Sequence, residues 1–543
     1  MGADPPTRPL PAEAEVVVIG GGFSGLGVAI RLAGDGIDDV VVLERAEDVG
    51  GTWQANTYPG CACDIPSHLY SFSFAPNPDW ANTYSRQPEI AAYLRGVAAE
   101  HGVRERVRTS CEVTGAHWDA DAARWTVEST HGVIRARVLV SAAGPLAEPR
   151  LPDVPGLDRF AGRVFHSARW DHGYDLTGKR VAVVGTGASA IQFVPEIAPL
   201  VERLYVLQRT PPWVIPHSAR PITPRERRLF RAVPPAQKLL RGAIYAAREL
   251  LVLGFAKRPD LMTLLERGAR AHLRRQVPDP ELRRLVTPEH LIGCKRILPS
   301  NRWYPALARD NVELVPEGLA AVTEHAAVTR SGRELAVDAI ICGTGFHATD
   351  MPIARRLRGR DGRTLAEVWN GSPRAHLGTT VPGFPNLFLL LGPNTGLGHS
   401  SMIYMIESQL AYVAGAIRAL RDRRLAALEV RPEAAAASSA DVDARAQGTV
   451  WNTGCRSWYL DGTGRNAALW PDFTFAFRRR LRRFDPAEYL LTERYAGSSA
   501  SSLSRSRSPN APSTPKWPSA SRGHSAAGRS QHSSRSLPSG SEM

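Results

Sequence analysis

The stretch AEVVVIGGGFSGLGVAIRLAG (14–34) decides the fold, because a strand, a glycine loop and a helix follow one another in it without a break. Its first seven residues, AEVVVIG (14–20), form a β-branched run that is typical of a buried parallel strand. A helical pattern continues to Gly34, and VVVLE (40–44) predicts the next strand. The N-terminal sequence therefore predicts a β-α-β unit.

The glycines of this unit have the spacing Gly20-x-Gly22-x-x-Gly25, which between a strand and a helix indicates a dinucleotide site. Gly20 permits the tight turn, Gly22 lets a pyrophosphate approach the helix N-terminus, and Gly25 lets helix and strand pack closely. Glu44 ends the second strand, where its carboxylate can accept hydrogen bonds from both hydroxyls of an unphosphorylated ribose. The glycines of GGTW (50–53) suit a second close approach of the backbone, so FAD fits this site better than NAD, although spacing alone does not prove it.

A second unit repeats the pattern about 165 residues later, with the strand RVAVVG (180–185), the loop GTGASA (185–190) and the strand LYVLQR (204–209). Ala190 replaces the third glycine, which is a permitted variant. Arg209 occupies the strand end that Glu44 occupies in the first unit, 24 positions after the first glycine in both. Arg209 and Thr210 suit the 2′-phosphate of a ribose through charge-assisted hydrogen bonds. The contrast of acid and base predicts one site for FAD and another for NADPH.

Length, composition and net charge indicate the class of protein and its partners. A chain of 543 residues, 43% hydrophobic and 22% charged, is typical of a globular enzyme with two or three domains. The net charge of +14 admits anionic partners, but arginines at 478–483 and in the C-terminal tail supply much of it, as in solvated surfaces. We therefore expect no nucleic-acid partner.

The six cysteines are sparse and have no metal-ligand spacing, so we expect no metal site and a reduced, cytoplasmic protein. The start of the chain lacks the pattern of a secretory signal, and no apolar stretch is long enough to span a bilayer. These features predict a soluble protein without stable membrane insertion.

We expect an α/β fold with two Rossmann-like dinucleotide-binding domains. The predicted domains are an FAD domain of residues 1–145 and 375–490, an NADP domain of residues 146–217 and 291–374, a helical insertion at 218–290, and a disordered Ser/Arg/Pro-rich tail at 497–543. The insertion is either packed on the nucleotide domains or forms a lid or membrane-surface helix that admits apolar substrates.

The segment just before the second glycine loop carries a further pattern, Phe160-x-Gly162-x-x-x-His166-x-x-x-Trp170-Asp171. It resembles the signature of the type I Baeyer–Villiger monooxygenases, which belong to the flavin-containing monooxygenase superfamily. Further similar motifs are YPG and CD within 58–64, QRTP (208–211), GCKR (293–296), GTGF (343–346) and PNTGLGHSSM (393–402), so the resemblance covers roughly residues 14–480.

The resemblance implies that NADPH reduces FAD, that O2 adds to the flavin to give a C4a-peroxide, and that this peroxide attacks a ketone. The product is an ester or lactone. Arg296 matches the active-site arginine of the family, Asp64 the carboxylate that orients it, and Lys295 a residue that contacts the 2′-phosphate. His166 and Trp170 match a linker that couples cofactor binding to domain motion, so general acid–base catalysis by His166 is not needed.

The full set of predicted cofactor-binding residues is Gly20, Gly22, Phe23, Ser24, Gly25, Glu44, Thr52, Trp53, Asp64, Tyr70, Val113, Gly185, Thr186, Gly187, Ala188, Ser189, Ala190, Gln192, Arg209, Thr210, Lys295 and Arg296. Two departures from the family are Cys61-Ala62, where an arginine is frequent, and Gly343, where alanine is usual.

Three other functions remain open at this stage. The first is a flavin monooxygenase that oxidises nitrogen or sulfur. The second is a disulfide reductase, which the spacing of Cys61 and Cys63 disfavours, because on an extended strand their side chains point to opposite faces. The third is a flavin-bound interaction protein whose basic tail recruits a nucleic acid or a membrane. Neither the ketone nor the oligomeric state follows from the sequence.

Overall fold

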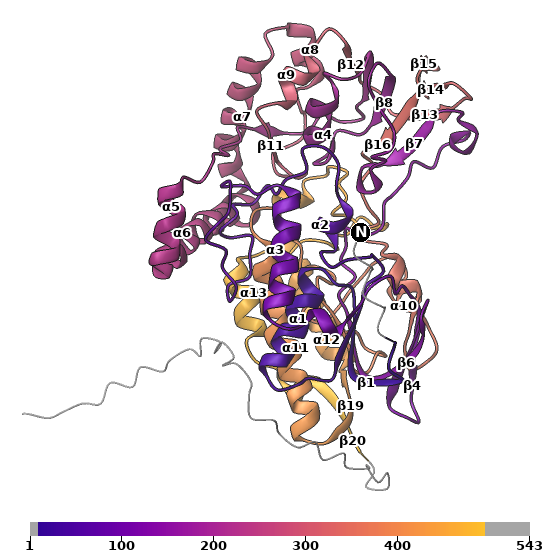
Figure 1. Cartoon of the computed structure of the whole chain (residues 1–543), viewed down its shortest axis with the longest axis vertical. Coiled ribbons are helices and arrows are strands. Elements are labelled where there is room, and N and C mark those ends of the chain that lie inside the picture. The colour runs from indigo at the N-terminus through magenta and orange to yellow at the C-terminus, as the bar shows by residue number, and fades with distance from the viewer. Residues whose placement is uncertain (1–8, 495–543) are drawn as a thin grey trace, which may run out of the picture. The chain divides into compact units, whose positions relative to one another are not determined.

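Each glycine loop leaves the end of a parallel strand, β1 in one sheet and β8 in another (Figure 1). The computed structural model describes residues 9–494, and all of them fall within one compact unit, Met1–Ser502. The tail at 497–543, for which the sequence predicts disorder, lies outside the described residues. The α/β class with two nucleotide-binding units is therefore confirmed for the described part of the chain.

The first sheet has the order β17-β4-β5-β6-β1-β2-β3, with β18 also pairing with β6. Its strands are β1 (Glu13–Ile19), β2 (Val40–Leu43), β3 (Val107–Arg108), β4 (Val113–Asp119), β5 (Arg124–Ser129), β6 (Gly132–Ser141), β17 (Leu357–Arg358) and β18 (Leu387–Leu389). In the parallel β1–β2 pair Ile19 lies opposite Leu43, so the first glycine loop and Glu44 leave the same edge of the sheet.

The second sheet is parallel throughout and has the order β12-β9-β8-β16-β7. Its strands are β7 (Arg163–His166), β8 (Arg180–Val184), β9 (Arg203–Leu207), β12 (Val312–Val315) and β16 (Ala339–Cys342). Val184 lies opposite Leu207, so Gln208, and not Arg209 as predicted, has the position that Glu44 has in the first sheet. The equal spacing of 24 residues therefore does not reflect an equal register, and Arg209 follows one residue after the position equivalent to Glu44.

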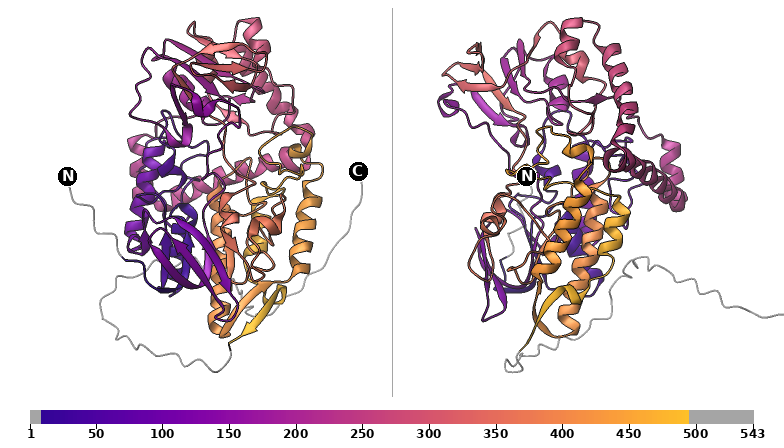
Figure 2. Two further views of the ribbon diagram at one scale, coloured as in Figure 1. Left: turned by 90° about the vertical axis from the view of Figure 1, so that its right-hand side faces the viewer. Right: turned by 180° about the vertical axis from the view of Figure 1, so that it is seen from behind.

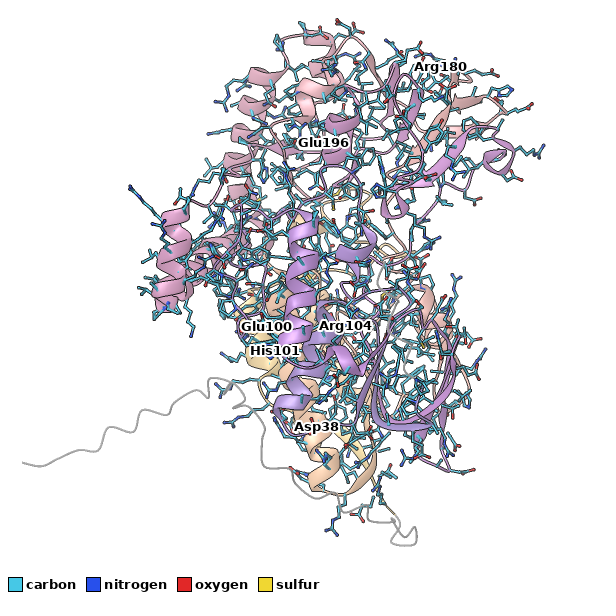
Figure 3. The ribbon with its side chains drawn as sticks, viewed as in Figure 1. Asp38, Glu100, His101, Arg104, Arg180 and Glu196 are labelled. Carbon is cyan, nitrogen blue, oxygen red and sulfur yellow. A yellow bond between two sulfur atoms is a disulfide. The ribbon has the colours of Figure 1, made fainter. Side chains whose placement is uncertain are left out.

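The stretch LAVDAIICGTGF (335–346) contributes to two strands. β15 (Glu334–Ala336) joins β13 (Leu319–Val322) and β14 (Ala326–Thr329) in a small antiparallel sheet, and only β16 enters the second sheet. Asp338 separates the two strands because its carboxylate binds the side chain of Arg180, at 2.9 Å from Nη2 to Oδ1, and also the backbone N–H of Arg180. Figure 3 labels Arg180 on this part of the molecule.

β17 pairs with β4 of the first sheet, although the proposed NADP domain contains residue 357. Ala354, Leu357, Leu365 and Trp369 are buried in the same cluster as strands of the first sheet. The proposed boundary at 374 would accordingly move to about residue 350. The sequence gives no sign of this return, because a two-residue strand has no measurable periodicity.

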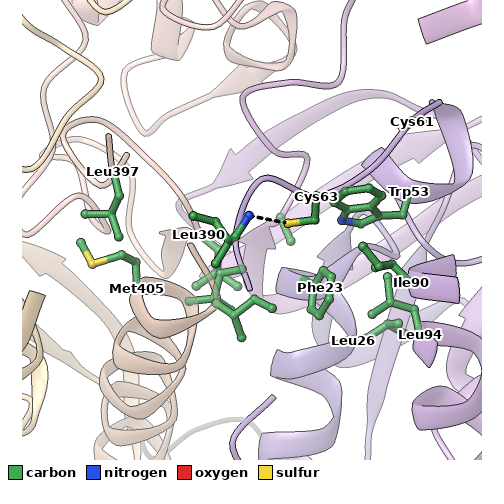
Figure 4. Packing of buried hydrophobic residues seen from close by; sticks show 14 of the residues in the cluster. Phe23, Leu26, Trp53, Cys61, Cys63, Ile90, Leu94, Leu390, Leu397 and Met405 are labelled. Carbon is green, nitrogen blue, oxygen red and sulfur yellow. Dashed lines mark hydrogen bonds between the residues drawn. The ribbon is translucent and has the colours of Figure 1, made fainter. Parts of the chain in front are cut away.

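Helices cover the first sheet on the side of the glycine loop. These are α1 (Phe23–Gly34), α3 (Gln87–Glu100), α11 (Met402–Asp422), α12 (Pro432–Ala446) and α13 (Thr474–Leu481). The strands β19 (Leu425–Val430) and β20 (Tyr489–Glu493) form a separate antiparallel pair. α11 packs against both α1 and α13. Phe23, Leu26, Trp53, Ile90 and Leu390 belong to the continuous core beneath these helices (Figure 4).

Residues 218–290 are helical, as the sequence predicts. They form α5 (Pro224–Ala232), α6 (Pro234–Val252), a π-helical turn η4 (Leu253–Lys257), η5 (Pro259–Leu261), α7 (Met262–Gln276) and α8 (Pro280–Leu285). Seen from behind, α5 and α6 project to one side of the sheets (Figure 2). Between residues 9 and 494, no helix is long and apolar enough to cross a membrane.

The contact between α1 and β1 depends on Gly25. A Cβ at this position would lie 1.8 Å from the carbonyl oxygen of Gly20. We expect Gly25→Ala to lower the free energy of unfolding by about 2 kcal/mol or more, because α1 must move away from the strand. Urea denaturation measures this change. Gly96→Ala in α3 is the control, because its Cβ would meet no atom within 4 Å and alanine favours a helix. Equal effects of the two substitutions would contradict the explanation.

Candidate functional site

The first glycine loop and Glu44 lie in direct contact. The Glu44 carboxylate is buried, and it accepts hydrogen bonds from the backbone N–H of Gly21 at 2.5 Å and of Ala46 at 2.8 Å. Cys111 N donates to the Glu44 carbonyl at 2.8 Å, which brings the start of β4 and the predicted residue Val113 to the same edge. A ribose bound to Glu44 would therefore lie between the glycine loop and residues 111–113.

The second pair of glycines, Gly50 and Gly51, contacts the first glycine loop. Gly51, with φ of +54°, lies so close to Gly22 that a Cβ at Gly51 would be 2.9 Å from the Gly22 Cα. This contact leads to Thr52 and Trp53, which begin the short helix α2 (Thr52–Ala55). Trp53 donates its indole N–H to the Tyr70 hydroxyl at 3.1 Å. These contacts link the first glycine loop through Gly51 and Trp53 to Tyr70, and the binding of a cofactor along them stays a prediction.

Buried polar atoms without partners lie at the N-terminus of α11. His399 Nδ1 and Ser400 Oγ form no hydrogen bond with any described residue. Buried polar atoms are normally satisfied, so these two indicate a polar ligand at this end of the helix. Together with the glycine surface they fit a flavin dinucleotide.

The second glycine loop is open on its outer side. A Cβ at Gly187 would meet no atom within 4 Å, whereas at Gly185 it would be 2.6 Å from the Gly343 carbonyl oxygen. Thr186 Oγ1 donates to the Thr210 carbonyl at 3.4 Å, which joins the loop to the end of β9. Ala188, Ser189 and Ala190 then lead into α4 (Ala190–Ile197). The loop therefore leaves room for a second dinucleotide.

Two cations meet beside this loop. Burial lowers the pKa of Lys295, and the neighbouring positive charge of Arg209 lowers it further. Such repulsion between two cations is relieved by an anion bound between them. The predicted 2′-phosphate site at Arg209, Thr210 and Lys295 is thus consistent with the arrangement of these side chains, and the contact with a phosphate stays a prediction.

Arg296 and Asp64 form a bidentate ion pair. Arg296 Nε donates to Oδ2 at 2.9 Å, and Nη2 donates to Oδ1 at 2.7 Å and to Oδ2 at 2.6 Å. Coulombic attraction by Asp64 raises the pKa of Arg296 above its ordinary value, so the guanidinium stays charged. Among the described residues Nη1 has no hydrogen-bond partner, which leaves one edge of the cation for an anionic ligand.

Gln192 joins the second nucleotide unit to the segment that carries Asp64. Its Oε1 accepts from Tyr58 OH at 3.0 Å and from Ala62 N at 3.2 Å, and its Nε2 donates to Ala62 O at 3.0 Å. The amide is therefore occupied by protein atoms, and the predicted contact of Gln192 with a cofactor stays a prediction. Sequence analysis missed this clamp because no local pattern marks a pair separated by 130 residues.

The segment from Phe160 to Asp171 borders the second sheet. His166 ends β7 opposite Cys342 of β16, is buried, and accepts from Ala168 N at 3.1 Å through Nδ1. Burial lowers the pKa of His166 to about 4, so the ring is neutral. Trp170 packs on Phe193 of α4, at 5.3 Å between ring centroids. These contacts favour a structural role for His166 over general acid–base catalysis.

Gly162 and Asp171 complete this segment. A Cβ at Gly162 would lie 2.5 Å from the ring of Phe160, and Asp171 accepts from Arg163 Nε at 2.6 Å. A surface hollow of about 440 Å³ is lined by Gly162, Arg163 and Asp171 and by neighbouring residues up to Tyr174. The signature is therefore partly accessible, and its conformational role stays a prediction.

The cysteines correct one expectation. Cys294 and Cys455 form a disulfide, so the prediction that all six cysteines are reduced is wrong for these two. Cys61 and Cys63 are free and buried, and burial raises the pKa of Cys61 to about 11. They do not form the redox pair that a disulfide reductase needs at its flavin.

An aromatic cluster lies beside the segment that carries the arginine, since it includes Ile292 and packs against Ile297. Tyr459 is buried, and its hydroxyl has no hydrogen-bond partner in the described chain. Burial raises the pKa of Tyr459, and the charge of Arg296 partly offsets this rise. Tyr459 packs with Trp451, Phe255 and Ile292. Sequence analysis missed Tyr459 and Cys455, because neither belongs to a motif with recognisable spacing.

Comparison with known proteins gives a consistent result. Residues 17–234 match the family model described as "Pyridine nucleotide-disulphide oxidoreductase". The chain is 54% identical over 476 residues to a Baeyer–Villiger monooxygenase of Streptomyces coelicolor, covering 87% of this chain and 92% of the relative. It is 51% identical over 493 residues to a Baeyer–Villiger monooxygenase of Pseudomonas aeruginosa, covering 90% and 93%. A crystal structure of an OTEMO complex with FAD and NADP has a TM-score of 0.79 at 27% identity, covering 88% of this chain and 99% of the other.

The low pKa of His166 makes stability depend on pH. The unfolded chain binds a proton near pH 6.5 that the folded chain binds only near pH 4, so stability falls as the pH drops through this window. The free energy of unfolding should therefore decrease between neutral pH and about pH 5, and His166→Asn should make this decrease smaller by about 2 kcal/mol. Urea denaturation at the two pH values measures it. His325→Asn, at a side chain that is 77% exposed, should leave the pH dependence unchanged. An equal loss in wild type and His166→Asn would refute the prediction.

Proposed function

Because the chain belongs to the family of Baeyer–Villiger monooxygenases, we propose that it inserts one oxygen atom from O2 next to a ketone carbonyl and so forms an ester or lactone. The observation that carries the proposal is the Arg296–Asp64 pair. It provides a permanently charged guanidinium with one free edge, in contact with the segment that follows the first glycine loop.

We assign FAD to the first glycine loop and NADPH to the second. Glu44, Gly22 and Gly51 support the first assignment, since they form a buried carboxylate and a glycine surface that a longer side chain would fill. Arg209 and Lys295 support the second. When bound, NADPH supplies the electrons and FAD carries them to O2.

The residues of the chain have three tasks in this reaction. Arg296 Nη1 stabilises the negative charge that develops on oxygen when the carbonyl is attacked, and this is most effective where water is scarce. Asp64 fixes the plane of the guanidinium through Nε and Nη2, so that Nη1 has one direction. The disulfide between Cys294 and Cys455 holds Tyr459 and its neighbours over the same segment and limits access of water.

Product analysis tests the reaction type. We incubate the FAD-loaded protein with NADPH, O2 and a panel of linear, cyclic and aromatic ketones and thioethers. Esters or lactones are expected from at least one ketone. If only sulfoxides form, the protein oxidises a heteroatom and the proposed insertion next to a ketone carbonyl is wrong. A disulfide reductase is tested by titrating thiols before and after addition of NADPH. The Cys455→Ser variant is used because it lacks the Cys294–Cys455 disulfide. Two new thiols in this variant would favour a disulfide reductase.

Arg296→Ala separates oxygen insertion from cofactor reduction. We expect anaerobic bleaching of the flavin by NADPH to continue within about threefold of wild type. Ester formation should fall by 10²-fold or more, because the cation is worth about 3 kcal/mol to the developing oxyanion. Arg302→Ala, at an exposed arginine of the same region that is paired with Glu196, is the matched control. Normal ester yield from Arg296→Ala would exclude the assignment.

Arg209→Ala tests the second dinucleotide. We expect the preference for NADPH over NADH, measured as the ratio of the two kcat/KM values, to fall by about tenfold or more, because a charge-assisted hydrogen bond to the 2′-phosphate is lost. Lys295→Ala should act in the same direction. The control is Arg330→Ala, at an exposed arginine in the turn between β14 and β15, and it should leave the ratio unchanged. An unchanged NADPH Michaelis constant in Arg209→Ala would show that no phosphate binds there.

A further inference from the structure

Helix α6 turns its polar side chains toward the protein. Gln237 Nε2 donates to Asn77 O at 2.6 Å, and Arg241 Nη1 donates to His68 O at 2.8 Å. Glu249 accepts from Thr474 N at 2.9 Å and from Thr474 Oγ1 at 2.8 Å. These contacts recur along the whole helix and fix its rotation about its own axis.

The opposite face of α6 is apolar and open. From Leu239 to Leu253 every exposed residue is aliphatic or glycine; they are Leu239, Leu240, Gly242, Ala243, Ala246, Ala247, Leu250 and Leu253. At 100° per residue they cover an arc of about 160°. Leu239 is 77% exposed and Leu250 65% exposed. We call these eight residues the α6 apolar face.

This arrangement is the reverse of an ordinary surface helix, whose apolar stripe faces the core and whose polar residues face water. Single exposed leucines need no explanation, but a continuous exposed stripe does. Exposed leucines also occur on other helices of the insertion, since Leu229 of α5 is 48% exposed and Leu264 of α7 is 65% exposed. The stripe therefore indicates a surface that contacts something apolar.

The insertion that carries the stripe has a strong positive charge. Residues 218–290 contain sixteen Lys and Arg but seven Asp and Glu, which gives +9 of the +14 of the whole chain. Exposed cations stand close to exposed leucines on the same helix: Arg225 and Arg228 before Leu229, Lys238 before Leu239, and Arg267 one turn after Leu264. None of these four cations has an ion-pair partner within residues 9–494.

We propose that the α6 apolar face and the cations around it dock on an anionic lipid surface, with α6 lying in the plane of the interface. An apolar stripe bordered by Lys and Arg is the pattern of an interfacial helix, and it does not require a membrane span. A second copy of the chain would bring two regions of +9 together, whereas an anionic bilayer neutralises them. The inference does not depend on the proposed oxygenation, because it uses no residue of the cofactor sites.

Vesicle co-sedimentation of the full-length, FAD-loaded protein tests the proposal. We expect sedimentation with vesicles of equal parts phosphatidylglycerol and phosphatidylcholine, but not with phosphatidylcholine alone, and a decrease as salt is raised. Leu239→Gln/Leu250→Gln should weaken binding about tenfold or more, because two leucines no longer enter the interface. Leu151→Gln/Leu200→Gln is the matched control, since these leucines are 51% and 52% exposed but lie outside residues 218–290.

Charge is tested separately by Arg225→Gln/Arg228→Gln/Lys238→Gln, which should weaken binding to the mixed vesicles and flatten its salt dependence. Absence of binding to the mixed vesicles, or equal binding by wild type and Leu239→Gln/Leu250→Gln, would overturn the proposal. Sedimentation velocity without vesicles tests whether a second copy of the chain binds the α6 apolar face instead. A dimer of wild type that becomes a monomer in Leu239→Gln/Leu250→Gln would show that a second copy covers this face.

Discussion

Two residues of one short segment hold the site together by binding separate parts of the chain. Cys294 is bonded to Cys455, and Arg296 binds Asp64. The last contact is the most demanding, because a partly buried guanidinium needs a carboxylate in good geometry. The same segment contributes Ile292 to the aromatic cluster of Tyr459 and Trp451.

Much of the fold could be predicted because its signals are local. The β-α-β units have strong strand and loop patterns, which placed Glu44 correctly at the end of its strand. The equal spacing of 24 residues was misleading by one position for Arg209, because the register of the second strand pair is one residue shorter. The Arg296–Asp64 contact was implied only by family resemblance, since 232 residues separate the two. Spacing along the chain does not encode such a distance.

The features that sequence analysis missed share a physical cause. The clamp of Gln192 on Ala62, the bond to Cys455 and the return of β17 to the first sheet all join distant segments through one side chain or a two-residue strand. The same reason applies to α6. Its helical period was evident, but periodicity does not say which face is turned inward, and here hydrogen-bonding partners such as Asn77 and Thr474 select the polar one.

The disulfide has a topological consequence. It closes the chain from Cys294 to Cys455 into a covalent ring that contains β12 and β16 of the second sheet, β17 and β18 of the first, and helix α11. Elements of both nucleotide-binding units therefore belong to one closed loop. Exchange of either set of strands with another molecule, the usual route to a domain-swapped dimer, requires this bond to open first.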